Sequence, residues 1–347
     1  MAATWSHRFT GTEEVSAGAG ALQSLPQLCE ARDMSAVVVV TGRTLREQTP
    51  VVSRVEQLLG ARHAGTYSGI REHVPSSAVE ELASLLREAT ADGVVAVGGG
   101  SPIDGAKAAL YHYDGGATGQ IAIPTTLSAA EFTFTAGVTD DATQRKGGVA
   151  HPRLTPRAVI LDPEVTLHTP ERLWLSTGIR ALDHAVETVY APERDRFADE
   201  LSLRAIAMLR TALPACKRDA TDLAAREQAQ IAAWYSGIGL AAVTVRPSHP
   251  LGRVLGASFG VGHGITSCVL LPASIDWMAA REPGLVQPLA AAFAVETPHQ
   301  VGNAVRAFVA SLGLPVSLRE AGLDEAALRS FTDMIPAEWA PIARAAF

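Results

Sequence analysis

The segment Val94–Asp104 limits the folds open to this chain more than any other part of it. It begins with Val-Val-Ala-Val, which is typical of a strand buried on both faces. Three glycines at positions 98–100 follow directly. Ser101 then suits the N-cap of a helix, Pro102 its first position and Asp104 the position of a capping box. Strand, glycine turn and helix in this order predict one unit of an open α/β sheet.

Such a turn can also bind a ligand. Glycines let a pyrophosphate approach the backbone closely, and the N-terminus of the next helix supplies free N–H groups and a positive dipole end. The segment Pro124–Ser128 follows the next strand, so it would lie at the same edge of the sheet. Its hydroxyl groups could contact a phosphate or a base. For each segment taken alone, an ordinary turn without a ligand is the alternative.

Strands and helices alternate around this segment. Apolar runs predict strands at 36–40, 93–97, 120–123 and 157–161. Helical spacing predicts helices at 78–91 and 102–110 between them, which implies a parallel sheet with helices on both faces. From about residue 160 the pattern is helical, with long helices expected at 173–189, 198–213, 224–240 and 296–312. We therefore expect an α/β domain over residues 1–160 and an all-helical domain over residues 161–347.

Length and composition exclude several classes of protein. A chain of 347 residues suggests about two domains, and 47% hydrophobic residues exclude a mainly disordered chain. A net charge of -7, with no basic run longer than two residues, argues against nucleic acid as the main partner. The longest apolar runs, 36–40 and 237–243, are too short for a bilayer, and residues 1–8 lack the apolar region of a signal peptide. Three cysteines far apart form no disulfide framework, so we expect a cytoplasmic protein.

Histidines and arginines gather in the second half of the chain. Arg180 and His184 share one face of a predicted helix because they are four residues apart. His249 lies four residues before Arg253, and His263 stands between two glycines. Three histidines from separate elements could converge on a metal ion or on a substrate. The alternative is that each is a structural histidine with its hydrogen bonds satisfied inside the protein.

Taken in order, these motifs resemble the iron-containing alcohol dehydrogenase superfamily, and within it most closely the maleylacetate reductases. The resemblance covers nearly the whole chain, and the combination is specific although each motif alone is weak. It implies a dinucleotide-binding α/β domain, a helical domain and an active site in the cleft between them. The segments that carry it are Gly18–Leu22, Gly98–Asp104 with Ala106 and Lys107, Pro124–Thr126, Asp162–Pro163, Arg180–Glu187, His249–Gly252, His263–Gly264 and Leu270–Pro272.

The resemblance also assigns the metal-ligand positions, and there the chain departs from the family. Metal-dependent members bind a divalent ion through one Asp and three His. The histidine positions match His184, His249 and His263, whereas the Asp position holds Arg180. A guanidinium cannot ligate a cation and stays charged. Asp183 points about 100° away from His184 around the helix, so we expect that it does not replace the ligand and that no metal binds.

These observations favour a metal-independent reductase that uses NADH or NADPH. Its substrate would be a small unsaturated or keto carboxylic acid. Arg180 and Arg253 would clamp the carboxylate or stabilise enolate charge, and one of the three histidines would supply the proton. Arg180 could instead form a salt bridge to Glu187, or to another acidic residue, that only fills the site.

Three alternatives stay open. The first is an alcohol dehydrogenase that binds iron or zinc through the three histidines. The second is a non-redox enzyme on the same fold, such as a lyase, a dehydratase or a cyclase. The third is a binding protein without activity, against which the nucleotide motifs argue. The resemblance further implies a homodimer, and neither nucleic acid nor a membrane is expected as a partner.

The cofactor site is expected at the edge of the sheet. In this superfamily an Asp after the first strand often holds the adenosine ribose, whereas this chain has Thr41-Gly42-Arg43, with Arg46 nearby. The change predicts tolerance of NADP, unless both arginines are solvated surface charges. Lys146 matches a lysine often found near the nucleotide or the substrate. The expected cofactor-binding residues are Gly42, Arg43, Gly98, Gly99, Gly100, Ser101, Asp104, Thr125, Thr126, Ser128 and Lys146.

Overall fold

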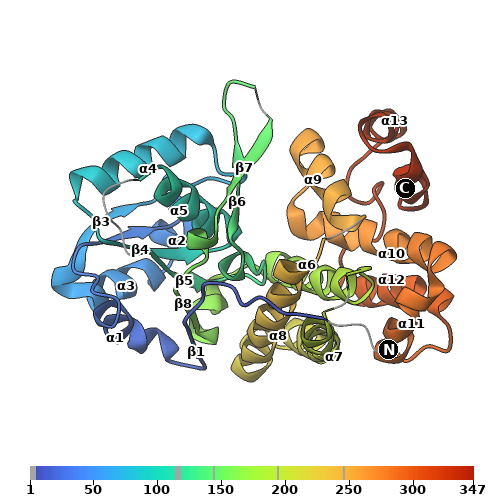
Figure 1. Ribbon diagram of the computed structural model, residues 1–347, viewed down its shortest axis with the longest axis horizontal. Coiled ribbons are helices and arrows are strands. Elements are labelled where there is room, and N and C mark those ends of the chain that lie inside the picture. The colour runs from blue at the N-terminus through green and yellow to red at the C-terminus, as the bar shows by residue number, and fades with distance from the viewer. Residues whose placement is uncertain (1–4, 114–118, 144, 194, 245–246) are drawn as a thin grey trace. The chain divides into compact units, whose positions relative to one another are not determined.

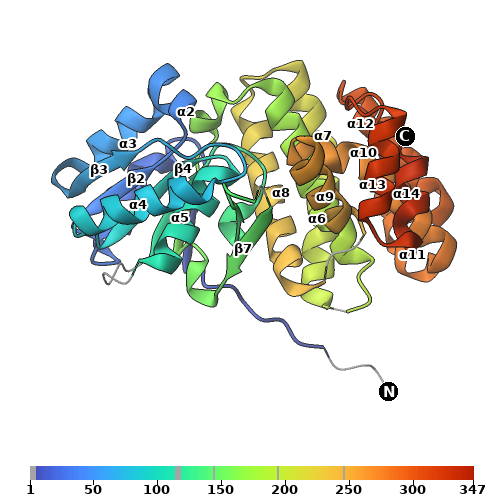
Figure 2. The same ribbon diagram turned by 90° about the horizontal axis from the view of Figure 1, so that it is seen from above.

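The computed structural model describes residues 5–113, 119–143, 145–193, 195–244 and 247–347. They form two units (Figures 1 and 2). One is an α/β unit, Phe9–Thr169, and the other is a helical unit, Pro170–Phe347, which also includes the N-terminal segment up to Arg8. The boundary expected near residue 160 falls inside the α/β unit, at the end of strand β8 (Ala158–Leu161).

The α/β unit is built on a six-stranded sheet in which all neighbouring strands are parallel. Across the sheet the order is β1 (Glu14–Ala17), β8, β5 (Gln120–Pro124), β4 (Gly93–Gly98), β2 (Val37–Val40) and β3 (His63–Tyr67). The four inner strands are buried at every residue, and these are the strands that the apolar runs predict. The two edge strands are partly exposed, which is why the sequence shows no apolar run for either.

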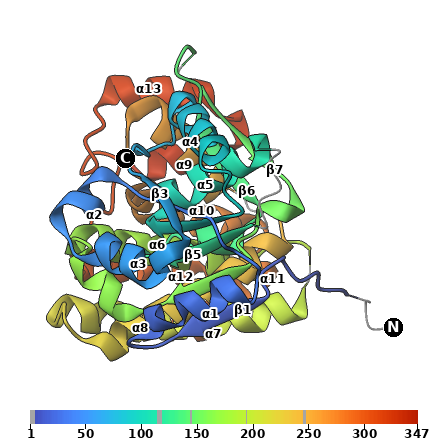
Figure 3. The same cartoon turned by 90° about the vertical axis from the view of Figure 1, so that its left-hand side faces the viewer.

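Helices cover both faces of this sheet (Figure 3). On one face, alternate valines of β2 and β4 share a core with helices α1 (Leu25–Glu30) and α3 (Val51–Leu59). On the other face, α4 (Ser76–Glu88) and α5 (Gly100–His112) contact each other. The unit also contains α2 (Arg43–Gln48) and an antiparallel hairpin of β6 (Thr135–Thr139) and β7 (Lys146–Ala150).

The start of α5 differs from the sequence prediction. The helix begins at Gly100, with Gly99 at the N-cap and no side-chain cap, so the prediction that Ser101 caps it was wrong. Because Gly99 has an extended backbone, it can end the loop without a hydroxyl group. Pro102 is therefore the third residue of the helix, which is the capping-box position, and Asp104 lies two residues beyond it.

The helical unit contains α6 (Glu171–Val189), α7 (Arg196–Arg218), α8 (Leu223–Ala242), α9 (Ser248–Phe259), α10 (His263–Arg281), α11 (Pro283–Ala292), α12 (Val301–Ser311), α13 (Glu325–Met334) and α14 (Ala340–Ala345). Helix α6 packs against α7, α8 and α10, and most of its residues are buried. Helix α12 begins later than predicted, because Thr297 caps a 3₁₀ turn at Pro298–Gln300 just before it. In the described ranges no helix is both long and apolar enough to cross a membrane.

A buried polar cluster links α5 to the loop after β5. Nζ of Lys107 donates to the carbonyl oxygens of Ala130 (2.5 Å) and Thr135 (3.0 Å), and its side chain is fully buried. Glu131 beside it is 1% exposed, and its Oε2 has no hydrogen-bond partner among the described residues. Burial raises the pKa of Glu131 to about 7.

This raised pKa predicts a pH-dependent stability. The folded protein binds the Glu131 proton more tightly than the unfolded chain does. The contribution of this proton to the free energy of unfolding is therefore present at pH 4 and is lost as the pH rises through about 7. We expect Glu131→Gln to be more stable than the wild type at pH 8, by on the order of 2–3 kcal/mol, and similar to it at pH 5. Urea unfolding at both pH values measures the difference. The exposed Glu88→Gln should show no such change, and an equal pH profile for Glu131→Gln and wild type would contradict the prediction.

Candidate functional site

The predicted glycine turn lies at the carboxyl end of β4. Gly98 has a φ of 141°, and a Cβ atom there would lie 2.9 Å from Cγ of Pro102. A Cβ at Gly99 would lie 3.2 Å from Cγ2 of Thr126, and one at Gly100 would lie 3.2 Å from Oγ of Ser128. The glycines therefore let the backbone at the start of α5 contact the polar side chains that follow β5.

Several hydroxyl groups at this edge of the sheet are buried without partners. Oγ1 of Thr41, Oγ1 of Thr126 and Oγ of Ser128 have no hydrogen-bond partner among the described residues. The N–H of Thr125 donates to the carbonyl of Gly98 (2.8 Å), which joins the loops after β4 and β5. Unpaired hydroxyls beside a helix N-terminus form a cradle for an anion, and this cradle fits the pyrophosphate of a dinucleotide.

Two other expected cofactor-binding residues, Gly42 and Arg43, lie at the start of α2. Gly42 is the N-cap of α2, and the side chain of Arg43 is 79% exposed, with its Nε 3.8 Å from Oε1 of Glu47. Nη1 of Arg46 donates to the carbonyl of Thr66 (3.2 Å). Arg43 thus forms a solvent-exposed ion pair with Glu47. Tolerance of NADP stays a prediction.

Asp104 and Lys146 connect α5 to the β6–β7 hairpin. Oδ2 of Asp104 accepts from the N–H of Gly137 (3.2 Å), and its Oδ1 lies 3.5 Å from Nζ of Lys107. A Cβ atom at Gly137 would lie 3.0 Å from Cε of Lys146. The carboxylate of Asp104 therefore supports the hairpin, and a direct cofactor contact by Asp104 or Lys146 stays a prediction.

In the helical unit, Arg180 projects from α6 toward α10. Its Nη1 donates to Oγ of Ser267 (3.1 Å) and lies 3.5 Å from Oδ2 of Asp183. The Arg180 side chain is 15% exposed, whereas that of Asp183 is fully buried. Within the described ranges, the ion pair of Arg180 is with Asp183, so the salt bridge to an acid that the alternative expected is present, although its partner is not Glu187.

Asp183 is the centre of this arrangement. Its Oδ2 accepts from Oγ of Ser267 (2.6 Å) and from Oγ of Ser248 (3.0 Å), and it lies 3.6 Å from Nδ1 of His249. Burial raises the pKa of Asp183, while His249 and Arg180 lower it. Asp183 was expected not to replace the missing ligand, yet it is one of the possible metal ligands that lie together in the described ranges. Residues three apart on a helix are neighbours on its surface, so Asp183 adjoins Arg180 even though it diverges from His184.

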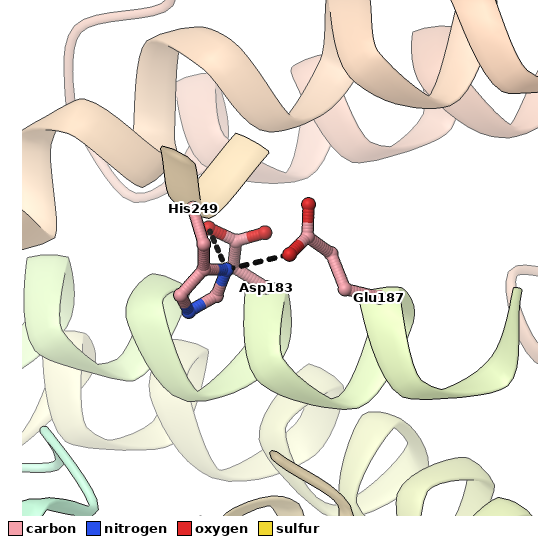
Figure 4. Close-up of side chains that lie close together, drawn as sticks. All are labelled: Asp183, Glu187 and His249. Atoms are coloured by element: carbon pink, nitrogen blue, oxygen red, sulfur yellow. Dashed lines mark hydrogen bonds and ion pairs between the residues drawn. The ribbon is translucent and has the colours of Figure 1, made fainter. Parts of the chain in front are cut away.

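Glu187 and His249 form a second buried pair (Figure 4). Nδ1 of His249 lies 2.7 Å from Oε2 of Glu187, and Oε1 of Glu187 accepts from the N–H of Ser248 (2.6 Å) and the hydroxyl of Tyr190 (3.2 Å). Burial raises the pKa of Glu187 to about 7. Burial and the Arg180 guanidinium lower the pKa of His249 to about 3. Glu187 thus fixes a neutral imidazole, and Nε2 of His249 is buried without a partner among the described residues.

The other two histidines lie differently. The ring of His184 is 4.8 Å from that of His249 between centroids, and burial lowers the pKa of His184. His263 begins α10, and a Cβ atom at Gly256 would lie 3.2 Å from its Cε1. His184 and His249 therefore lie side by side with their rings tilted by 34°, and His263 packs against Gly256 of α9.

The possible metal ligands that lie together differ from the three histidines that the resemblance implies. In the described ranges, the group of possible ligands within 4.8 Å of one another is Asp183, Glu187 and His249, not the three histidines. Protein donors already occupy Oδ2 of Asp183 and both oxygens of Glu187. A cation there would have to displace these donors beside the guanidinium of Arg180.

Arg253 adds a second positive charge. It lies on α9, four residues after His249, and its side chain is exposed. The charge of Arg253 lowers the pKa of both Arg180 and His249. The structure therefore places Arg253 within electrostatic reach of the predicted site.

Two serines that the sequence does not single out, Ser248 and Ser267, donate to Asp183. An Arg and an Asp three residues apart on an otherwise buried helix are a signal for an internal ion pair. Ser248 and Ser267 carry no such signal, because their role depends on which helices pack together.

Comparison with known proteins agrees with the fold. Residues 12–163 match the family described as iron-containing alcohol dehydrogenase, and residues 174–338 match its C-terminal domain. Maleylacetate reductase of Pseudomonas sp. (strain P51) is 34% identical over 324 residues, which is 93% of this chain and 89% of that protein.

Two solved structures are also similar. Maleylacetate reductase from Agrobacterium tumefaciens has a TM-score of 0.90 and 28% identity, and covers 99% of this chain and 98% of its own. The same enzyme from Rhizobium sp. strain MTP-10005 has the same TM-score, identity and coverage. The expected fold, an α/β domain and a helical domain, is confirmed. This chain therefore belongs to the iron-containing alcohol dehydrogenase superfamily, as an oxidoreductase most like the maleylacetate reductases.

Proposed function

We propose that this protein is a metal-independent reductase that transfers hydride from NADH or NADPH to a keto or unsaturated carboxylic acid. The observation that carries the proposal is Arg180. It stands where metal-dependent relatives have an Asp ligand, and Asp183 and Ser267 hold its guanidinium in place. A fixed guanidinium can stabilise developing negative charge, as a metal ion would.

The cradle at the start of α5 supports the proposal that NADH or NADPH is the cofactor. Thr41, Thr126 and Ser128 have unpaired hydroxyls that can donate to phosphate oxygens, and the glycines leave room for close approach. The reduced nicotinamide supplies the hydride when it is bound. The similar relatives are named maleylacetate reductases, which agrees with a reductive reaction.

Two arginines support the proposal that the substrate carries a carboxylate. Arg180 is partly exposed, and its two contacts among the described residues are both made by Nη1, so the remaining N–H groups can donate to a carboxylate. Arg253 is exposed and brings net positive charge. The proton comes from one of the three histidines. Among them His249 has its ring oriented by a carboxylate, but its lowered pKa of about 3 leaves the ring neutral near pH 7, so it suits a proton acceptor better than a proton donor.

Turnover with and without metal tests this function. The protein is purified, treated with a chelator and analysed for iron and zinc, and oxidation of NADH or NADPH is followed at 340 nm with maleylacetate and with short keto acids. We expect turnover to survive chelation and to be unchanged when iron or zinc is added back. Stoichiometric metal that activity requires would instead establish the metal-dependent alcohol dehydrogenase, with Asp183, Glu187 and His249 as its first candidate ligands.

A further inference from the structure

We propose that Ser267 is a positioning residue, which aligns the guanidinium of Arg180 for the reaction without touching the substrate itself. The inference rests on the proposed function and deepens it. It names the contact that lets Arg180 present its N–H groups in a fixed direction, and it assigns a separate task to Asp183.

The contacts of Ser267 on α10 have defined directions. Its side chain lies in the interior, 1% exposed, and its Oγ is 3.1 Å from Nη1 of Arg180 and 2.6 Å from Oδ2 of Asp183. A guanidinium only donates hydrogen bonds, and an ionised carboxylate only accepts them. The hydroxyl of Ser267 therefore accepts from Arg180 and donates to Asp183, so it connects the two side chains in one orientation.

The ion pair with Asp183 does not by itself fix the direction of Arg180. Nη1 of Arg180 lies 3.5 Å from Oδ2 of Asp183, which is longer than the roughly 2.7–2.9 Å of a charge-assisted hydrogen bond. Oδ1 of Asp183 is buried without a hydrogen-bond partner among the described residues, so the two side chains form no bidentate pair. Asp183 thus supplies the countercharge, and the hydrogen bond to Ser267 supplies the direction.

Helix α9 also lies close to Nη1 of Arg180. A Cβ atom at Gly252 would be 3.8 Å from this nitrogen and 2.9 Å from Oγ1 of Thr266. Nη1 is therefore the anchored end of the guanidinium, among residues of α6, α9 and α10. Nε and Nη2 are the groups left for a carboxylate, or for the negative charge that develops during hydride transfer.

Without the hydroxyl of Ser267, we expect Arg180 to turn toward Asp183. Oδ1 of Asp183 is a ready second acceptor, so the guanidinium can close into a bidentate pair and point its N–H groups away from the substrate. The charge of Arg180 stays, and attraction of the substrate depends mainly on that charge. Stabilisation of the transition state depends on direction. In Ser267→Ala, kcat should therefore fall about tenfold, while KM for maleylacetate changes less than about threefold.

A double-mutant cycle with Arg180→Met tests whether Ser267 acts through Arg180. Steady-state kinetics with NADH or NADPH and maleylacetate give kcat for both single variants and for the double variant. If Ser267 acts only through the guanidinium, Ser267→Ala should cause no further loss of kcat once Arg180 is gone. A tenfold loss in both backgrounds would show that Ser267 acts independently of Arg180 and would overturn the inference.

Two other serines separate direction from structure. Ser248→Ala removes the second hydroxyl that donates to Oδ2 of Asp183 (3.0 Å) but leaves the contact with Arg180 in place, so its loss of kcat should be smaller. An equal loss would mean that Ser267 only satisfies Asp183. Ser274→Ala removes a fully buried hydroxyl of the same helix that has no partner among the described residues, and should keep the kcat of the wild type.

A second variant decides the matter should Ser267→Ala fail to fold. Ser267→Cys fills almost the same space with a group that donates and accepts only weakly, so kcat should fall while the packing is kept. A folded Ser267→Cys or Ser267→Ala protein with the kcat of the wild type overturns the inference and leaves the proposed reductase intact. Absence of turnover of the wild type with any keto or unsaturated carboxylate refutes the proposed function, and this inference with it.

Discussion

Replacing Arg180 by Met is expected to lower kcat/KM for a carboxylate substrate at least about a hundredfold. The variant loses the oriented N–H donors and also exposes the substrate to the charge of Asp183, which no longer has its ion-pair partner. Asp183 keeps its hydrogen bonds from Ser267 and Ser248, so the fold should survive. The cradle for the cofactor is built from other residues. The dissociation constant of NADH or NADPH, measured by fluorescence titration, should therefore be unchanged while steady-state kinetics show the loss.

Three further variants define the role of Arg180. Arg180→Lys keeps the charge but not the planar fork, and should lose about tenfold. The double variant Arg180→Met/Asp183→Asn should recover part of the activity, because it removes the unpaired negative charge. Arg204→Met, on the exposed face of α7, should behave as wild type. Full activity in a folded Arg180→Met protein would show that Arg180 only fills the vacated ligand position.

The sequence predicted the centre of the fold better than its edges. Strand β2 is four consecutive valines, and β4 is Gly-Val-Val-Ala-Val-Gly. These residues alone predict burial on both faces. Strand β3 reads His-Ala-Gly-Thr-Tyr and is only partly buried. An edge strand has one neighbour and less to bury, and therefore no distinctive pattern. The hairpin β6–β7 was missed for the same reason, since β7 is largely exposed and contains two glycines.

The site was predicted in its residue types but not in its connections. The sequence indicated that Arg180 replaces an acidic ligand, and it placed Arg180 and His184 on one helix face. It could not show that Ser267 of α10 and Ser248 of α9 both donate to Asp183, because these contacts depend on the packing of three helices. A helical projection measured from His184 also concealed the proximity of Asp183 to Arg180, about 60° apart by the geometry of an α-helix.

Replacing Gly264 by Ala is expected to cost about 3 kcal/mol of stability and to lower Tm by several degrees. Gly264 is the second residue of α10, where α10 packs against α6. A Cβ atom at Gly264 would lie 2.7 Å from Oγ of Ser176 and 2.8 Å from its backbone carbonyl carbon. A backbone atom cannot rotate away, so the two helices must separate. Calorimetry gives the change in Tm.

The same substitution should also reduce activity, because the helices that separate hold the two ends of the Arg180–Ser267 hydrogen bond. Gly284→Ala is the matched control. Gly284 lies in the first turn of α11 with no heavy atom within 4 Å of a built Cβ, so alanine there should leave activity unchanged and raise stability by about 0.4–1 kcal/mol. A Tm of Gly264→Ala equal to wild type would mean that α6 and α10 pack less closely at Ser176. The position of Arg180 would then depend on Asp183 rather than on the packing of α6 against α10.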